Sequence, residues 1–202
     1  MSIVPASAAA GARGALAPLA RALVALGISA NAVTISGSLL TVAGAAVLAA
    51  GHPGVALAIL LVGTLADTLD GQMARLAGGG TKLGGFLDST FDRLSDAALM
   101  VAAALVGVAR SDPALVASAL IALVSGSLVP YVRAKAESLG LTASVGLAPR
   151  EARLAITVLG IAAWAVTGSH TLFAAAIAIV ALLSTITAIQ RIAHVARALR
   201  NT

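Results

Sequence analysis

Six long apolar stretches, separated by short polar or Gly/Pro-containing breaks, constrain this chain more than any other feature. A helix needs about 20 mostly apolar residues to cross the hydrocarbon core of a bilayer. Hydrophobic residues make up 59% of the chain and charged residues only 10%, whereas about 25% of a soluble domain is charged. The pattern predicts an all-α integral membrane protein, a single domain over residues 1–202. The six expected transmembrane helices cover residues 31–50, 54–76, 84–109, 113–138, 152–168 and 171–195.

The N-terminal segment, residues 1–28, differs from these stretches. Residues 9–27 are rich in Ala and Leu, but they also carry Arg13 and Arg21 with Pro18 between them. This composition predicts an amphipathic helix that lies in the cytoplasmic interface of the membrane. The alternative is an extension of the first span. The segment lacks a long apolar core followed by a cleavage pattern, so we do not expect a removable signal peptide.

The positions of the basic residues predict the topology. With the N-terminus inside, all of the 13 Lys and Arg residues except Arg110 fall on the cytoplasmic side, and such a bias sets the orientation of membrane proteins. We therefore expect a multi-pass protein of the cytoplasmic membrane with both termini in the cytoplasm. The net charge of +5 is spread beside apolar spans, so it favours anionic lipid and phosphate as partners over nucleic acid.

Acidic residues are concentrated in one part of the chain. Of the eight acidic residues, five lie between positions 67 and 96, namely Asp67, Asp70, Asp88, Asp92 and Asp96. Carboxylates at membrane depth are costly and usually mark function. The spacings i, i+3 and i, i+4 place Asp67 with Asp70 on one helix face, and Asp88 with Asp92 on another. A turn through residues 78–80 would fold the two helices antiparallel and bring both pairs together.

Four carboxylates around one space would repel one another unless a cation lies among them. Oxygen ligands without His or Cys favour a hard ion such as Mg²⁺, Mn²⁺ or Ca²⁺, and the chain contains no cysteine. Two ions would balance four carboxylates and could hold a diphosphate between them. The alternative is that the aspartates cap helices or pair with Arg75, Lys82 and Arg93, and this alternative is strongest for Asp96.

Residues 67–92 have the form Asp-x2-Asp-Gly-x2-Ala-Arg-x8-Gly-x3-Asp-x3-Asp. This pattern resembles the signature of the CDP-alcohol phosphotransferase family, whose members transfer a phosphatidyl or related group from a CDP-linked donor to an alcohol and release CMP. The resemblance implies an active site that faces the cytoplasm, CDP-diacylglycerol as donor and a homodimer. It also implies that Asp67, Asp70 and Asp88 bind two Mg²⁺ ions, for which Mn²⁺ can substitute. Asp92 would take the proton from the attacking hydroxyl and also contact the second ion.

The same resemblance implies a donor site. Gly71 and Ala74 would let the nucleotide approach the helix, Arg75 would bind a phosphate oxygen, and Thr81 would offer a hydroxyl. Relatives often have Pro-Asn where this chain has Ala30-Asn31, and the retained Asn31 is expected near the nucleotide. Other roles stay open: helix packing for Gly71 and Ala74, a membrane anchor for Arg75, and an N-cap for Thr81. Asn31 is also expected to cap the first span.

Basic residues near the ends of the last three spans suggest the acceptor. They are Arg133, Lys135, Arg150, Arg153 and Arg191. Each could be a membrane anchor, but five on three helices would suit an alcohol that carries a phosphate. The pattern around residues 131–141, 150–154 and 190–191 resembles the actinobacterial phosphatidylinositol phosphate synthases, which implies inositol 1-phosphate as acceptor. The alternative is a phosphatidylglycerophosphate synthase that uses glycerol 3-phosphate.

Two other classes of membrane protein make different predictions. A secondary transporter or channel would use the aspartates as ion sites and would show inverted repeats or broken helices, and the sequence shows neither. A structural protein would pair its charges internally, which does not account for the uninterrupted acidic motif. The three histidines, His52, His170 and His194, are far apart in the sequence and are expected to be isolated solvent or interface residues.

Overall fold

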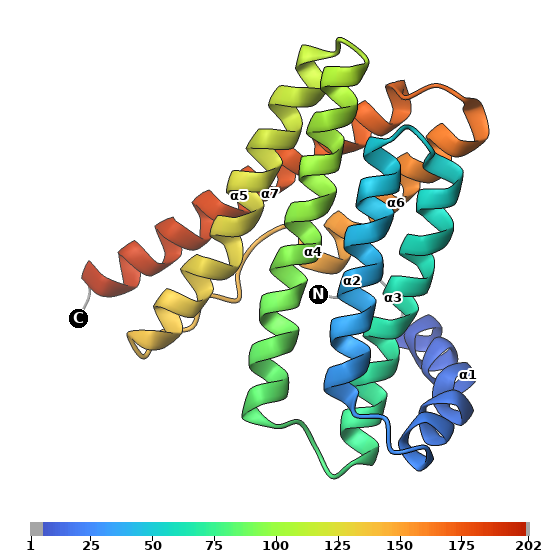
Figure 1. Cartoon of the computed structure of the whole chain (residues 1–202). Helices are drawn as coiled ribbons and strands as arrows, with labels where there is room; N and C mark the ends of the chain where they lie inside the picture. The colour runs from blue at the N-terminus through green and yellow to red at the C-terminus, as the bar shows by residue number, and fades with distance from the viewer. Residues whose placement is uncertain (1–5, 201–202) are drawn as a thin grey trace. The chain divides into compact units, whose positions relative to one another are not determined.

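The structure is a computed structural model that describes the backbone of residues 6–200 and the side chains of residues 16–200. Residues 6–200 form seven helices and no strand, as Figure 1 shows. This confirms the all-helical prediction, and each expected apolar stretch is helical. The helices are α1 (Ala6–Ala25), α2 (Ala30–Ala49), α3 (Pro53–Leu76), α4 (Lys82–Ala109), α5 (Pro113–Ser138), α6 (Arg150–Thr167) and α7 (Thr171–Arg200).

Four of the described helices, α2, α3, α5 and α7, are long and apolar enough to cross a membrane by length and composition. The other two expected spans, α4 and α6, do not meet this criterion because they contain more charged residues or are shorter. Helix α4 carries Asp88, Asp92, Arg93 and Asp96 between its start and its middle, and α6 has only 18 residues with Arg150, Glu151 and Arg153 in its first turn. The charges that carry the predicted chemistry are therefore also the charges that lower the hydropathy of these helices.

Local sequence signals explain several of the helix ends. Asp112 caps α5 by accepting a hydrogen bond from the Leu115 amide at 3.0 Å, with Pro113 as the first helical residue. Gly168 ends α6 in the left-handed conformation, with φ of 72°, which glycine adopts without strain. The prediction that Asn31 caps α2 is wrong. The helix begins at Ala30, and the hydroxyl of Ser29 accepts from the Ala32 amide at 3.2 Å, so Asn31 lies inside the first turn.

The described residues divide into two compact units. The first contains α1, most of α2 and α3, and α4 up to Leu99. Glycines let α2 and α3 approach closely: a Cβ on Gly37 would lie 2.8 Å from the Ala66 Cβ, and one on Gly63 would lie 2.7 Å from the Thr41 Oγ1. Helix α1 is continuous through Pro18.

Helix α1 packs on the C-terminal part of α3. Ala20 is fully buried against Leu69 and Met73, with Leu23 and Val24 beside them. Its apolar face is thus partly covered by protein. Arg13, one of the two arginines on which the amphipathic prediction rests, lies outside the residues whose side chains the structure describes.

In the second unit, α7 packs against both α5 and α6. Gly160 of α6 faces α7 so closely that a Cβ would lie 2.6 Å from the Ala176 Cβ. His170 is not isolated, which corrects the sequence interpretation. Its Nε2 lies 3.2 Å from Asp112 Oδ2, and its ring meets Trp164 edge-on. The start of α5 and the start of α7 are therefore joined by a side-chain contact.

Candidate active site

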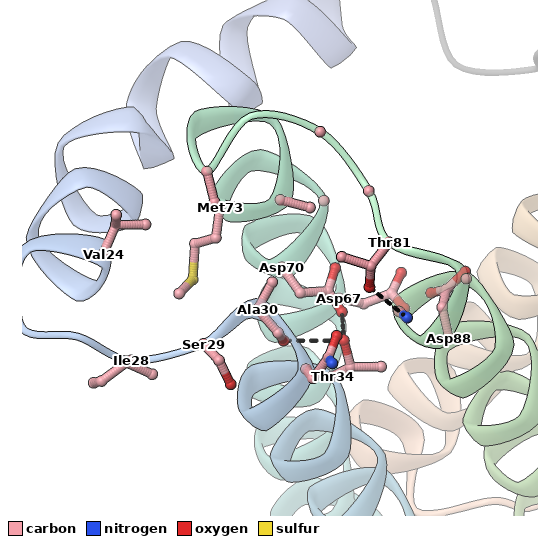
Figure 2. Close-up of a pocket in the computed structure, with 18 residues that line it drawn as sticks. Val24, Ile28, Ser29, Ala30, Thr34, Asp67, Asp70, Met73, Thr81 and Asp88 are labelled. Carbon is pink, nitrogen blue, oxygen red and sulfur yellow. Dashed lines mark hydrogen bonds between the residues drawn. The ribbon is translucent and has the colours of Figure 1, made fainter.

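A pocket of about 490 Å³ lies in the first unit. Its walls come from the end of α1 and the segment that follows it, the first turns of α2, the end of α3, the turn at residues 79–81 and the start of α4. Figure 2 shows its two ends. Val24, Ile28 and Met73 form an apolar end, and Asp67, Asp70 and Asp88 lie at the polar end.

Asp67, Asp70 and Asp88 come together as the sequence predicted. Each offers one carboxylate oxygen, and these three oxygens lie within 4.8 Å of one another. Asp70 is buried, with 6% of its surface exposed, whereas Asp67 and Asp88 are exposed to the pocket. Three negative charges at this distance repel one another strongly unless a cation offsets them. The oxygen donor set fits a hard divalent cation.

Asp92 lies outside this group. It is one turn beyond Asp88 on α4, it is half-buried, and it does not line the pocket. Its Oδ2 forms an ion pair with Arg93 Nη1 at 3.5 Å. Asp96 lies a further turn along the same helix and is also outside the group. The structure therefore arranges the acidic motif as three converging carboxylates with a fourth set apart.

Four of the five residues expected at the donor site line the pocket: Asn31, Gly71, Ala74 and Thr81. Arg75 is exposed and does not line it, although its Nη1 lies 3.7 Å from the position that a Cβ on Gly71 would take. The alternative role of Thr81 as an N-cap is confirmed, because its Oγ1 accepts from the Gly84 amide at 2.9 Å.

Steric crowding explains why the motif has glycine at position 84. A Cβ there would lie 3.1 Å from Asn31 Oδ1 and 3.2 Å from Thr81 Oγ1. Both neighbours are pocket residues, so a larger residue would displace polar side chains that line the pocket.

Sequence reasoning missed Thr34 and the apolar end of the pocket. Thr34 donates to Asp70 Oδ2 at 2.6 Å, which Figure 2 shows as a dashed line. Its position one turn after Asn31 on a helix was the available signal, since i, i+3 neighbours share a face. Nothing in the spacing of Val24, Ile28 and Met73 could place them in one pocket, because they meet only through the packing of α1 on α3.

The basic residues expected at the acceptor site lie in the second unit. Arg191 of α7 donates from Nε to the Val145 carbonyl at 2.8 Å and from Nη1 to the Val129 carbonyl at 2.9 Å. Arg133 and Arg153 lie close enough to repel its charge. Arg153 is buried, and Arg133 pairs with Glu137 at 2.8 Å on the surface of α5.

The other two residues of this set are less enclosed. Lys135 is exposed on α5, and Arg150 is half-buried as the first residue of α6. The structure thus gathers Arg133, Arg153 and Arg191 into one group, which we call the basic cluster. Two of the hydrogen-bonding nitrogens of Arg191 already serve main-chain carbonyls, which the sequence interpretation did not foresee.

The helical fold and the acidic motif define a class of membrane transferase, and a family comparison agrees with them. The model of the CDP-alcohol phosphatidyltransferase family matches residues 27–196. The chain belongs to this family, which confirms the resemblance found in the sequence.

Two individual relatives within the family are enzymes named as inositol phosphate lipid synthases. The chain is 41% identical over 140 residues to the archaetidylinositol phosphate synthase of Methanothermobacter thermautotrophicus, with 68% of each chain covered. It is 39% identical over 141 residues to the phosphatidylinositol phosphate synthase of Corynebacterium glutamicum, which covers 67% of this chain and 63% of that one.

Solved structures of the Mycobacterium tuberculosis phosphatidylinositol phosphate synthase are also similar. The structure with CDP-DAG bound matches with a TM-score of 0.83 at 33% identity, over 89% of this chain and 92% of that one. The structure in complex with manganese and citrate matches with a TM-score of 0.81 at 34% identity, over 88% and 87% of the two chains.

Proposed function

We propose that this protein transfers the phosphatidyl group of CDP-diacylglycerol to a hydroxyl of inositol 1-phosphate, giving phosphatidylinositol phosphate and CMP. The observation that carries the proposal is the convergence of Asp67, Asp70 and Asp88 within 4.8 Å at the positions of the family motif. The choice of acceptor is supported by the names of the relatives and by the basic cluster of Arg133, Arg153 and Arg191.

Asp67, Asp70 and Asp88 would hold divalent cations, Mg²⁺ or Mn²⁺, and two ions would suit a diphosphate. The fit rests on their oxygen-only donor set and close spacing, and a related enzyme has been crystallised with manganese. When bound, such ions polarise phosphoryl oxygens and offset the charge that develops on a leaving phosphate.

Five residues of the first unit would position the donor, and a sixth would accept the proton of the attacking hydroxyl. Asn31, Gly71, Ala74 and Thr81 face the space for the nucleotide, and Arg75 would reach a phosphate oxygen from its edge. Asp92 would accept the proton of the acceptor hydroxyl. The hydroxyl oxygen forms a bond to the phosphatidyl phosphorus as the bond from that phosphorus to the CMP oxygen breaks.

The basic cluster, together with Lys135 and Arg150, would bind the phosphate of the acceptor. Charge-assisted hydrogen bonds from arginine suit such a group. Arg191 would do so with the guanidinium donors that remain beside its two main-chain hydrogen bonds.

In the membrane, we propose six spans, with α4 and α6 joining the four more apolar helices. Both termini and the pocket would face the cytoplasm, as the distribution of basic residues favours. Helix α1 would lie at the cytoplasmic interface, and two copies of the chain would form a homodimer. In this arrangement Asp88, near the start of α4, would face the pocket and not lipid, which lowers the cost of its charge in the membrane.

The direct test is CMP release by the purified protein with CDP-diacylglycerol and Mg²⁺. We expect release with inositol 1-phosphate and little without an acceptor. The Asp67→Asn variant serves as the inactive control. If CMP is released with glycerol 3-phosphate but not with inositol 1-phosphate, the protein is a phosphatidylglycerophosphate synthase and the proposed acceptor is wrong. No release with any alcohol would refute the proposed reaction.

A further inference from the structure

The buried aspartate of the pocket has a dedicated partner. Asp70 is 6% exposed, and Thr34 Oγ1 lies 2.6 Å from its Oδ2. The same hydroxyl lies 3.1 Å from the Ala30 carbonyl one turn earlier. A threonine hydroxyl has one proton to donate, and an ionised carboxylate is the stronger acceptor. The shorter contact therefore takes the proton, and the hydroxyl bonds across from α2 to α3.

The backbone keeps Thr34 in this place. Gly37, one turn further along α2, packs so closely on α3 that an added Cβ would lie 2.8 Å from Ala66 and 3.3 Å from the Gly63 carbonyl. Ala66 and Asp70 are one turn apart on α3, as Gly37 and Thr34 are on α2. The distance between the two helices is thus fixed directly beside the Thr34–Asp70 hydrogen bond.

This hydrogen bond restricts how Asp70 can rotate. A free aspartate changes its side-chain torsions readily, and three carboxylates that repel one another would turn apart in the absence of a cation. With Oδ2 held by Thr34, the carboxyl group of Asp70 stays directed at Asp67 and Asp88 (Figure 2). Partners that orient a metal ligand in this way typically change metal affinity by about 10- to 100-fold when they are lost.

We propose that Thr34 is a positioning residue for the acidic site, and that its hydroxyl sets the affinity of the three aspartates for a divalent cation. The inference rests on the proposed function of the aspartates. Thr34 contacts Asp70 rather than the reacting atoms, so its loss should weaken cation binding more than turnover at saturating cation.

The experiment compares Thr34→Val, which removes the hydroxyl at nearly constant shape, with Thr34→Ser, which keeps it. Thr64→Val is the matched control, because Thr64 is an exposed threonine of α3 whose hydroxyl donates to the Leu60 carbonyl of its own helix. Binding of Mn²⁺ to the purified protein is measured by electron paramagnetic resonance of the free ion, without substrates. The Mg²⁺ concentration that gives half-maximal CMP release is measured in parallel.

We expect Thr34→Val to weaken Mn²⁺ binding by about 10- to 100-fold, Thr34→Ser to restore most of it, and Thr64→Val to leave it unchanged. Wild-type Mn²⁺ affinity in Thr34→Val would overturn the inference. So would an equal defect in Thr34→Ser, because that result would assign the effect to packing of the methyl group. If Thr34→Val does not purify as a folded protein, Thr34→Ala replaces it under the same criteria.

The Mn²⁺ binding data distinguish a failure of this inference from a failure of the proposed function. If the wild-type protein binds no Mn²⁺, the proposed metal site itself is wrong. If the wild-type protein binds Mn²⁺ and Thr34→Val binds it equally well, the metal site stands and only the role of Thr34 is wrong.

Discussion

The acidic pocket of the first unit and the basic cluster of the second unit hold their charges in different ways. Asp67, Asp70 and Asp88 lie on two helices joined by a short turn, and their carboxylates face one another. Arg133, Arg153 and Arg191 come from three helices, and Arg191 is fixed by two main-chain carbonyls, one of them in the loop before α6. The acidic site is thus organised by helical spacing across one turn, whereas the basic one depends on how α5, α6 and α7 and the loop before α6 pack together.

Because of this difference, we expect substitutions in the two regions to affect the reaction differently. In the acidic pocket, we expect each of the three carboxylates to be needed, because the affinity for a divalent cation depends on the number and charge of its oxygen ligands. In the basic cluster, like charges repel one another, and removal of one arginine leaves the others to bind a phosphate. Changes in the acidic pocket should therefore abolish the reaction, whereas changes in the basic cluster should weaken one substrate.

The largest effect is expected for Asp70→Asn, which keeps the shape of the buried side chain and removes its charge. The loss of a cation ligand should lower kcat by about 1,000-fold or more, because a bound metal contributes several kcal/mol to charge stabilisation and each 1.4 kcal/mol is about tenfold in rate. CMP release under saturating substrates is the measurement. Asp112→Asn, a carboxylate change in the second unit, is the control. Activity of Asp70→Asn within tenfold of wild type would contradict the proposed site.

The next effect is that of Asp92→Asn. Loss of a general base should lower kcat by about 100- to 10,000-fold. Binding of CDP-diacylglycerol and of Mn²⁺ should largely survive, because Asp92 lies outside the group of three carboxylates and pairs with Arg93. Equilibrium binding of the donor, measured beside CMP release, separates the two quantities. A loss of donor binding as severe as in Asp67→Asn would show that Asp92 is mainly a metal ligand.

A smaller and more selective effect is expected in the basic cluster. Arg153→Gln and Arg191→Gln should raise the KM of the phosphorylated acceptor by about 10- to 100-fold, since a hydrogen bond to a charged group contributes about 1.5–3 kcal/mol. The KM of the donor should change little. Arg197→Gln is the control on α7, where the arginine is exposed and bonds to the Ala193 carbonyl of its own helix. Equal rises in both KM values would count against an acceptor phosphate site.

The same contrast explains how far the sequence could be interpreted. The helices followed from apolar length and from local caps such as Asp112 and Gly168, and the three converging aspartates followed from helical spacing across one turn. All of these features depend on residues that are close together in the sequence, so the sequence pattern alone can predict them. The position of Asp92 was harder to predict, because i, i+4 spacing gives a shared face but not which residue on that face reaches the pocket.

Tertiary packing accounts for what the sequence did not predict. The bond of Thr34 to Asp70 and the apolar wall of Val24 and Met73 depend on how α1 and α2 lie against α3. The bond of Arg191 to the Val145 carbonyl depends on the course of residues 140–149, which has no periodic signal, and its bond to the Val129 carbonyl depends on the packing of α7 on α5. Ser29 and Asn31 are both good helix caps, and only the observed backbone decides between them.

The smallest effect is expected at Asp112, which tests whether the second unit has a purely structural carboxylate. Its two oxygens serve the Leu115 amide at 3.0 Å and His170 at 3.2 Å. Asp112→Ala should lower the free energy of unfolding by about 1 kcal/mol through loss of the N-cap, and Asp112→Asn by less, because asparagine also caps helices. Thermal unfolding in detergent is the measurement, with both KM values as the readout of function. A changed KM in either variant would show that this carboxylate contributes to substrate binding, and the division between a catalytic acidic pocket and a structural acid in the second unit would then fail.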